Sequence, residues 1–140
     1  MPHIERTIDI VWEGSVARGS GTISGRSGAF TNLPFSEPSR IALTEGDTSP
    51  EELLAAAHAG CLTMSIAGEL TRARTPPTRL EVSCTIVMDE VEGQGHEIIA
   101  SHVTLGGDEV SDEIIELADK GCPFSRLLER AGVEVTITRS

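Results

Sequence analysis

The sequence predicts an α+β fold with a mostly antiparallel sheet and a long central helix. Segments with a two-residue apolar period occur in groups, and helical segments are inserted between these groups without regular alternation. No linker, repeat or low-complexity stretch divides the 140 residues, a length typical of one domain. We therefore expect a single domain over residues 1–140, with an aliphatic core because aromatic residues make up only 3% of the chain.

The N-terminal third predicts three strands followed by a loop. Apolar and polar residues alternate over 4–13 and 16–24, on either side of Glu13-Gly14-Ser15, which is typical of a hairpin with a tight turn. A third strand is expected over 28–34. The prolines, serines and glycines of 35–47 then indicate an irregular segment.

The long helix is predicted to begin at residues 49–52, Ser-Pro-Glu-Glu. Ser49 suits the N-cap, Pro50 the first helical position and Glu52 a capping box. The apolar pattern continues until the prolines of 75–77 stop it. Because the helix is apolar over much of its circumference, we expect it to be central and buried.

The second half begins with a predicted hairpin. Strict alternation over 80–89 places Cys84 on the apolar face of a strand, so this thiol is interpreted as structural. Gly93-Gln94-Gly95 then connects to a second strand over 96–105.

The C-terminal third predicts two helices and a final strand. A helix over 110–120 is expected to end at Gly121, and a strand over 133–138 closes the chain. Between them, Pro123 opens a short helix and makes Cys122 its N-cap. A thiol at this position feels the positive end of the helix dipole, which lowers its pKa and favours reaction.

The charge balance and the cysteine count narrow the class of protein. Eleven Lys and Arg against 22 Asp and Glu give a net charge of -11, which disfavours binding to nucleic acids and anionic membranes. The first residues lack the apolar stretch of a secretory signal, and we expect no segment with the roughly 18 apolar residues of a spanning helix. We therefore expect a cytoplasmic protein, and in that reducing compartment three cysteines indicate buried thiols or redox chemistry and not structural disulfides.

Cys61 lies inside the long helix, where burial would raise the pKa of its thiol. A nucleophilic Cys61 would therefore need a nearby cation to hold the thiolate. His58 lies one turn earlier, either close enough for a Cys-His pair or as a helix-face histidine with no special role. Glu51 either places favourable charge at the helix N-terminus or orients an arginine beside the thiolate.

Two motifs resemble signatures of the OsmC/Ohr family, whose members are thiol peroxidases. The stretch from Thr48 to Cys61, TSPEELLAAAHAGC, resembles the first signature, and the stretch from Lys120 to Ser125, KGCPFS, resembles the resolving-cysteine segment. The motifs occur in family order, and the order of strands and helices fits nearly the whole chain. The resemblance is closer to the OsmC branch and implies an intertwined homodimer with two active sites at the subunit interface.

The resemblance also implies roles for individual residues. Cys61 would be the peroxidatic thiol and Cys122 the resolving thiol, while Glu51 would pair with an arginine that holds the thiolate. In the OsmC branch this arginine matches Arg40, whose spacing to Glu51 and Cys61 we prefer. Arg26 matches the position used by the Ohr branch and is the reserve.

The implied activity is reduction of organic hydroperoxides, and of hydrogen peroxide less certainly, without a cofactor or a metal. Cys61 would become a sulfenic acid, a disulfide with Cys122 would follow, and a dithiol reductant would restore both thiols. Three alternatives stay open: a zinc site on His58, Cys61 and Cys122, cysteine hydrolase chemistry, and a non-enzymatic stress-related binding protein on the same fold.

Overall fold

The computed structural model describes residues 3–140, which form two compact units that meet in sequence at Pro50 and Glu51. Met1 and Pro2, the start of the segment assessed for a secretory signal, lie outside the described residues. The class is α+β as predicted, with two three-stranded sheets and a long helix. A single domain over residues 1–140 stays a prediction.

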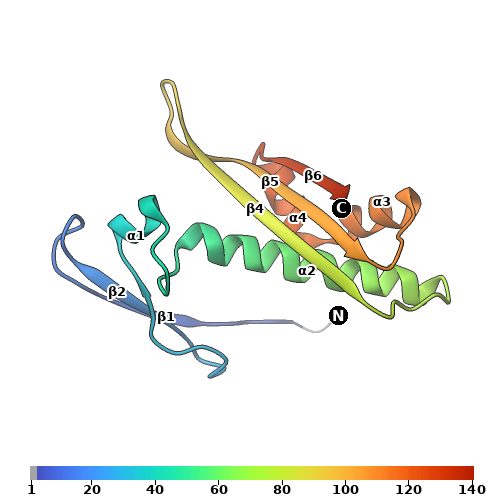
Figure 1. The fold of residues 1–140 in the computed structure, drawn as a ribbon, viewed down its shortest axis with the longest axis horizontal. Helices are drawn as coiled ribbons and strands as arrows, with labels where there is room; N and C mark the ends of the chain where they lie inside the picture. Colours follow the sequence, from blue (N-terminus) through green and yellow to red (C-terminus); the bar gives the residue numbers. More distant parts are fainter. Residues whose placement is uncertain (1–2) are drawn as a thin grey trace. The chain divides into compact units, whose positions relative to one another are not determined.

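The N-terminal unit contains an antiparallel sheet in the order β1-β2-β3 and a short helix. Its elements are β1 (Ile8–Glu13), β2 (Ser20–Gly25), β3 (Leu33–Phe35) and α1 (Glu37–Ala42) (Figure 1). Strand β1 pairs along its whole length with β2, from Ile8 opposite Gly25 to Glu13 opposite Ser20. The first two strands are therefore where the alternation predicts them.

Three predictions for this unit were wrong in detail. The hairpin has no tight turn, because residues 14–19 connect the strands and the Gly19 N–H donates to the Ser15 carbonyl at 2.6 Å. The third strand covers only 33–35. The segment 35–47 holds α1, which Ser36 starts with a capping box. A helix of six residues is too short to show a helical period, so only its cap could have revealed it.

The C-terminal unit contains a second sheet and three helices that follow the predicted order. Its elements are α2 (Pro50–Arg72), β4 (Leu80–Val91), β5 (Gly95–Gly107), α3 (Asp112–Gly121), α4 (Pro123–Arg130) and β6 (Glu134–Arg139). Strands β4 and β5 form an antiparallel hairpin, and β6 runs parallel to β5. The parallel pair arises because the connection passes through α3 and α4, and parallel neighbours need such a crossover.

Helix α2 packs one side against this sheet and against α3 (Figure 1). Its buried residues recur every fourth position, which is the spacing of one helical stripe. They are His58, Leu62, Ile66 and Leu70. The apolar core joins three of them to Val103, Leu105, Val110, Ala118 and Cys122.

The expectation that α2 is buried over much of its circumference was wrong for a single chain. The side chain of Met64 is 76% exposed, and Ala56, Ala57 and Gly60 on the same side are exposed too. The expectation that no segment could span a membrane was also wrong by length and composition, since an 18-residue window of α2 has a mean hydropathy of 1.3. A core helix of a soluble protein meets the same criterion, so an apolar surface is what this finding establishes.

Candidate active site

The structure brings together the thiols of Cys61 and Cys122, which lie on different helices. Cys61 is half-buried in α2, whereas Cys122 is fully buried between α3 and α4. Cys61 packs against the core cluster that contains Cys122, and the Cys122 side chain is close enough to affect the ionisation of the Cys61 thiol. Packing of α2 against α3 therefore brings together two cysteines that are far apart in the sequence, and they form a dithiol.

The environment of Cys61 opposes its ionisation within this chain. The pKa of the Cys61 thiol is raised, first by burial and then by the neighbouring Cys122 thiol. The backbone N–H of Phe124 acts in the opposite direction and lowers this pKa. The balance agrees with the sequence argument that a thiolate here needs a further positive group.

Both sulfur atoms lie at the N-terminus of α4. Cys122 is the N-cap, as predicted, and its Sγ accepts the Ser125 N–H at 3.4 Å. Because the Phe124 N–H reaches Cys61, a second free amide of the same helix turn serves the other thiol. These amides carry the partial positive charge of the helix end. The sequence identified Cys122 as the cap, whereas the proximity of Cys61 to the same helix end was indicated only by the family resemblance, through the implied disulfide.

His58 is fully buried and pairs with two serines. Its Nδ1 lies 2.6 Å from the Ser101 Oγ on β5, and its Nε2 lies 2.7 Å from the Ser125 Oγ on α4. Burial lowers the pKa of His58, which Asp119 partly opposes, so the ring is held neutral. His58 therefore bridges β5 and α4. This position differs from both expectations, a Cys-His pair with Cys61 and a helix-face histidine with no special role.

Cys84 belongs to the same buried polar group as His58. Its Sγ lies 3.3 Å from the Ser101 Oγ and 4.0 Å from the His58 Nδ1. The side chain points from β4 into the core, as the alternating pattern predicts. Cys84 thus contacts His58 and Ser101, whereas the two neighbouring thiols are those of Cys61 and Cys122.

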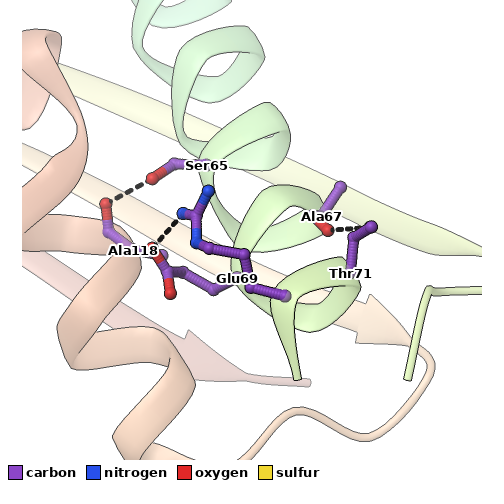
Figure 2. A network of polar contacts seen from close by, with 6 residues as sticks. Ser65, Ala67, Glu69, Thr71 and Ala118 are labelled. Atoms are coloured by element: carbon purple, nitrogen blue, oxygen red, sulfur yellow. Dashed lines mark hydrogen bonds and ion pairs between the residues drawn. The ribbon is translucent and has the colours of Figure 1, made fainter. Parts of the chain in front are cut away.

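A second polar contact connects α3 to α2 at a position C-terminal to Cys61, whereas His58 lies on its N-terminal side. Figure 2 shows the Ser65 hydroxyl donating to the carbonyl of Ala118, a bond of 2.7 Å. Ser65 lies one turn after Cys61, and Ala118 lies one turn before Cys122. The end of α3 is therefore held beside the thiols.

The charged residues that the family resemblance selects lie in different units. Arg40 is exposed on α1 and lines a pocket of about 260 Å³ with Trp12 and Phe35 in the N-terminal unit. Glu51 is half-buried in the first turn of α2. Arg26 makes two hydrogen bonds to the carboxylate of Asp9 on β1, at 2.9 and 3.0 Å. Arg26 is thus already paired within its own sheet, and a role for Arg40 and Glu51 at Cys61 stays a prediction.

The zinc and hydrolase alternatives fit this geometry poorly. Both ring nitrogens of His58 are engaged by serine hydroxyls, so the ring offers neither a lone pair to zinc nor a base to Cys61. Within residues 3–140, no group of three or more His, Cys, Asp or Glu side chains is placed to hold a metal ion.

Comparisons with known proteins agree with the two motifs. A family model for OsmC-like proteins matches residues 43–138. Peroxiredoxin OsmC from Escherichia coli strain K12 is 36% identical over 132 residues, which cover 90% of this chain and 89% of the relative. The organic hydroperoxide resistance protein OhrB of Bacillus subtilis superposes with a TM-score of 0.75 at 20% identity, covering 96% of this chain and 98% of that chain. An OsmC-like protein of unknown function from Vibrio cholerae gives 0.78 at 12% identity, covering 99% and 100%.

Proposed function

Because the chain belongs to the OsmC family, as its motifs predict, we propose that it is a thiol-dependent peroxidase that reduces organic hydroperoxides. The observation that carries the proposal is the proximity of the Cys61 and Cys122 side chains, with Cys122 at the N-cap of α4. The curated relative from Escherichia coli is named a peroxiredoxin, and a solved structure with the same fold is named an organic hydroperoxide resistance protein. These names support a peroxidase role for a dithiol of this kind.

Cys61 is the peroxidatic thiol in this proposal because it is the more accessible sulfur. Cys61 is half-buried, whereas Cys122 is 0% exposed and cannot meet a peroxide first. The Cys61 thiolate attacks one peroxide oxygen, the O–O bond breaks, and the alcohol leaves after taking up a proton. Arg40, oriented by Glu51, holds the thiolate together with the Phe124 N–H.

Cys122 then resolves the sulfenic acid. Its sulfur attacks the Cys61 sulfur, the S–S bond forms, and the hydroxyl leaves with the Cys122 proton as water. The proximity of the two cysteine side chains supports this step, since a positioned nucleophile reacts as if highly concentrated. A dithiol reductant afterwards restores both thiols by exchange, and the more exposed Cys61 sulfur is its first target.

We also propose that the protein is a soluble, cytoplasmic homodimer. The exposed side of α2 carries the small residues Ala56, Ala57 and Gly60 together with Met64. A second copy of the chain fits this surface, because small side chains let two helices approach closely and Met fills the remaining space. In β1, Ile8 and Ile10 are about half exposed, which adds apolar surface for a partner to cover.

The test is consumption of an organic hydroperoxide by prereduced protein, followed by mass spectrometry of wild type, Cys61→Ser and Cys122→Ser. One peroxide consumed per chain and a disulfide between Cys61 and Cys122, with no reaction in Cys61→Ser, would support the peroxidase. Unchanged peroxide and two free thiols in a folded dimer would contradict it and favour a non-enzymatic binding protein. Light scattering on the same samples tests the dimer.

A further inference from the structure

The segment that carries Cys122 is attached to α2 at two points on either side of the thiols. On one side Ser65 donates to the carbonyl of Ala118 at 2.7 Å. On the other side the His58 Nε2 lies 2.7 Å from the Ser125 Oγ. In α2 these anchors flank Cys61 by one turn each, and in the second segment they flank Cys122.

The His58 anchor lies where water does not compete. His58, Ser101 and Ser125 are each 0% exposed. A neutral imidazole has one N–H and one lone pair, so one serine must accept from the ring and the other must donate to it. With Ser101 holding Nδ1 at 2.6 Å, the ring cannot turn without leaving a buried polar group unpaired.

Ser125 connects this anchor to the resolving thiol. It lies in the first turn of α4, and its backbone N–H donates to the Cys122 Sγ at 3.4 Å. The hydroxyl of Ser125 takes no part in that bond and pairs with the Nε2 of His58. A shift of Ser125 would therefore move the helix end that contacts both sulfur atoms.

We propose that His58 is the positioning residue of the resolving step: through Ser125 it holds the first turn of α4 so that the Cys122 thiol faces Cys61. This inference rests on the proposed function. His58 touches neither the peroxide nor the reacting sulfurs in this role. Its importance follows from the steep dependence of nucleophilic attack on distance and angle.

A slower resolving step has a chemical signature of its own. The Cys61 sulfenic acid has two fates: attack by Cys122, which releases water, or attack on a second hydroperoxide, which gives a sulfinic acid and an alcohol. If α4 is displaced, the attack by Cys122 slows, and a larger share of the sulfenic acid reacts with a second hydroperoxide. The yield of sulfinic acid therefore reports on positioning separately from overall stability.

The chain offers a matched pair of variants. Ser125→Ala and Ser101→Ala each remove one fully buried hydroxyl from the same imidazole, but only Ser125 belongs to α4. A second pair of variants replaces the imidazole by an amide. The Gln amide of His58→Gln can reach the place of Nε2, whereas the shorter Asn amide of His58→Asn reaches only that of Nδ1. Circular dichroism establishes that each variant is folded.

Prereduced protein is mixed with one equivalent of cumene hydroperoxide, quenched with acid at intervals, alkylated and analysed by mass spectrometry. We expect Ser125→Ala and His58→Asn to form the disulfide about tenfold more slowly than wild type, with more sulfinic acid at excess peroxide. Ser101→Ala and His58→Gln should stay within about threefold of wild type. A folded Ser125→Ala that closes the disulfide as fast as Ser101→Ala overturns the inference. Failure of the proposed function looks different, since wild type would then form no disulfide.

Discussion

The buried neutral His58 predicts a specific pH dependence of stability. Burial lowers the pKa of His58 below its ordinary value of 6.5, while Asp119 acts weakly against this. Below pH 6.5, His58 therefore binds a proton in the unfolded chain that it does not bind in the folded chain, and the free energy of unfolding falls. The contribution is fully present above pH 6.5 and is lost as the pH falls toward the folded-state pKa. One proton limits the slope to about 1.4 kcal/mol per pH unit.

The assay is urea unfolding of wild type and His58→Gln between pH 7.5 and 5, compared as a difference. His3, His96 and His102 are all exposed and are present in both proteins, so the difference isolates His58. Wild type should lose stability relative to His58→Gln as the pH falls, although the variant starts lower by about 1–3 kcal/mol for its imperfect hydrogen bonds. Parallel curves at every pH would refute the neutral, desolvated histidine.

Further predictions address the thiols, the dimer and a carboxyl pair. Cys122→Ser should attack peroxide at about the wild-type rate but stop at a sulfenic acid that dimedone traps; loss of the attack would give Cys122 an earlier role. Met64→Glu should weaken the dimer at least about tenfold by light scattering, because a charge would enter an apolar interface; an unchanged dimer would place the interface elsewhere. The neighbouring Asp119 carboxyl, together with partial burial, raises the pKa of Glu129, so this pair loses stability as the pH rises above 4.5. Glu129→Gln should therefore be more stable than wild type at pH 7, by no more than about 1 kcal/mol at this exposed site, and a urea midpoint below that of wild type would contradict the pairing.

The C-terminal unit could be predicted well because its elements are long and periodic. Thirteen residues of β5 and 23 residues of α2 show their period several times over. The N-terminal unit was predicted less well, since β3 has three residues and α1 six. The connection before Ser20 was misplaced because the alternation also runs through residues that do not pair with β1.

In the candidate site too, features that depend on adjacent residues could be predicted, whereas features that depend on residues far apart in the sequence could not. The N-cap position of Cys122 could be read from Pro123, because the signal lies in adjacent residues. The partners of His58 could not, since Ser101 and Ser125 are ordinary residues on other elements and only packing brings them to the ring. Burial of α2 was overestimated because a sequence pattern marks apolar surface without saying whether the same chain or another copy covers it.

The balance of charges around Cys61 explains why the proposed chemistry includes an arginine from the other unit. Burial and the Cys122 thiol raise the pKa of Cys61, and the Phe124 N–H alone opposes them within the C-terminal unit. A helix end offers only about half a positive charge, which favours a thiolate too little to offset burial, and the net charge of -11 disfavours one. The proposed function therefore calls for a full guanidinium charge, and Arg40, the residue proposed to supply it, belongs to the N-terminal unit. Peroxide reactivity should therefore require both units, since the C-terminal unit holds the dithiol but not the cation that would activate it.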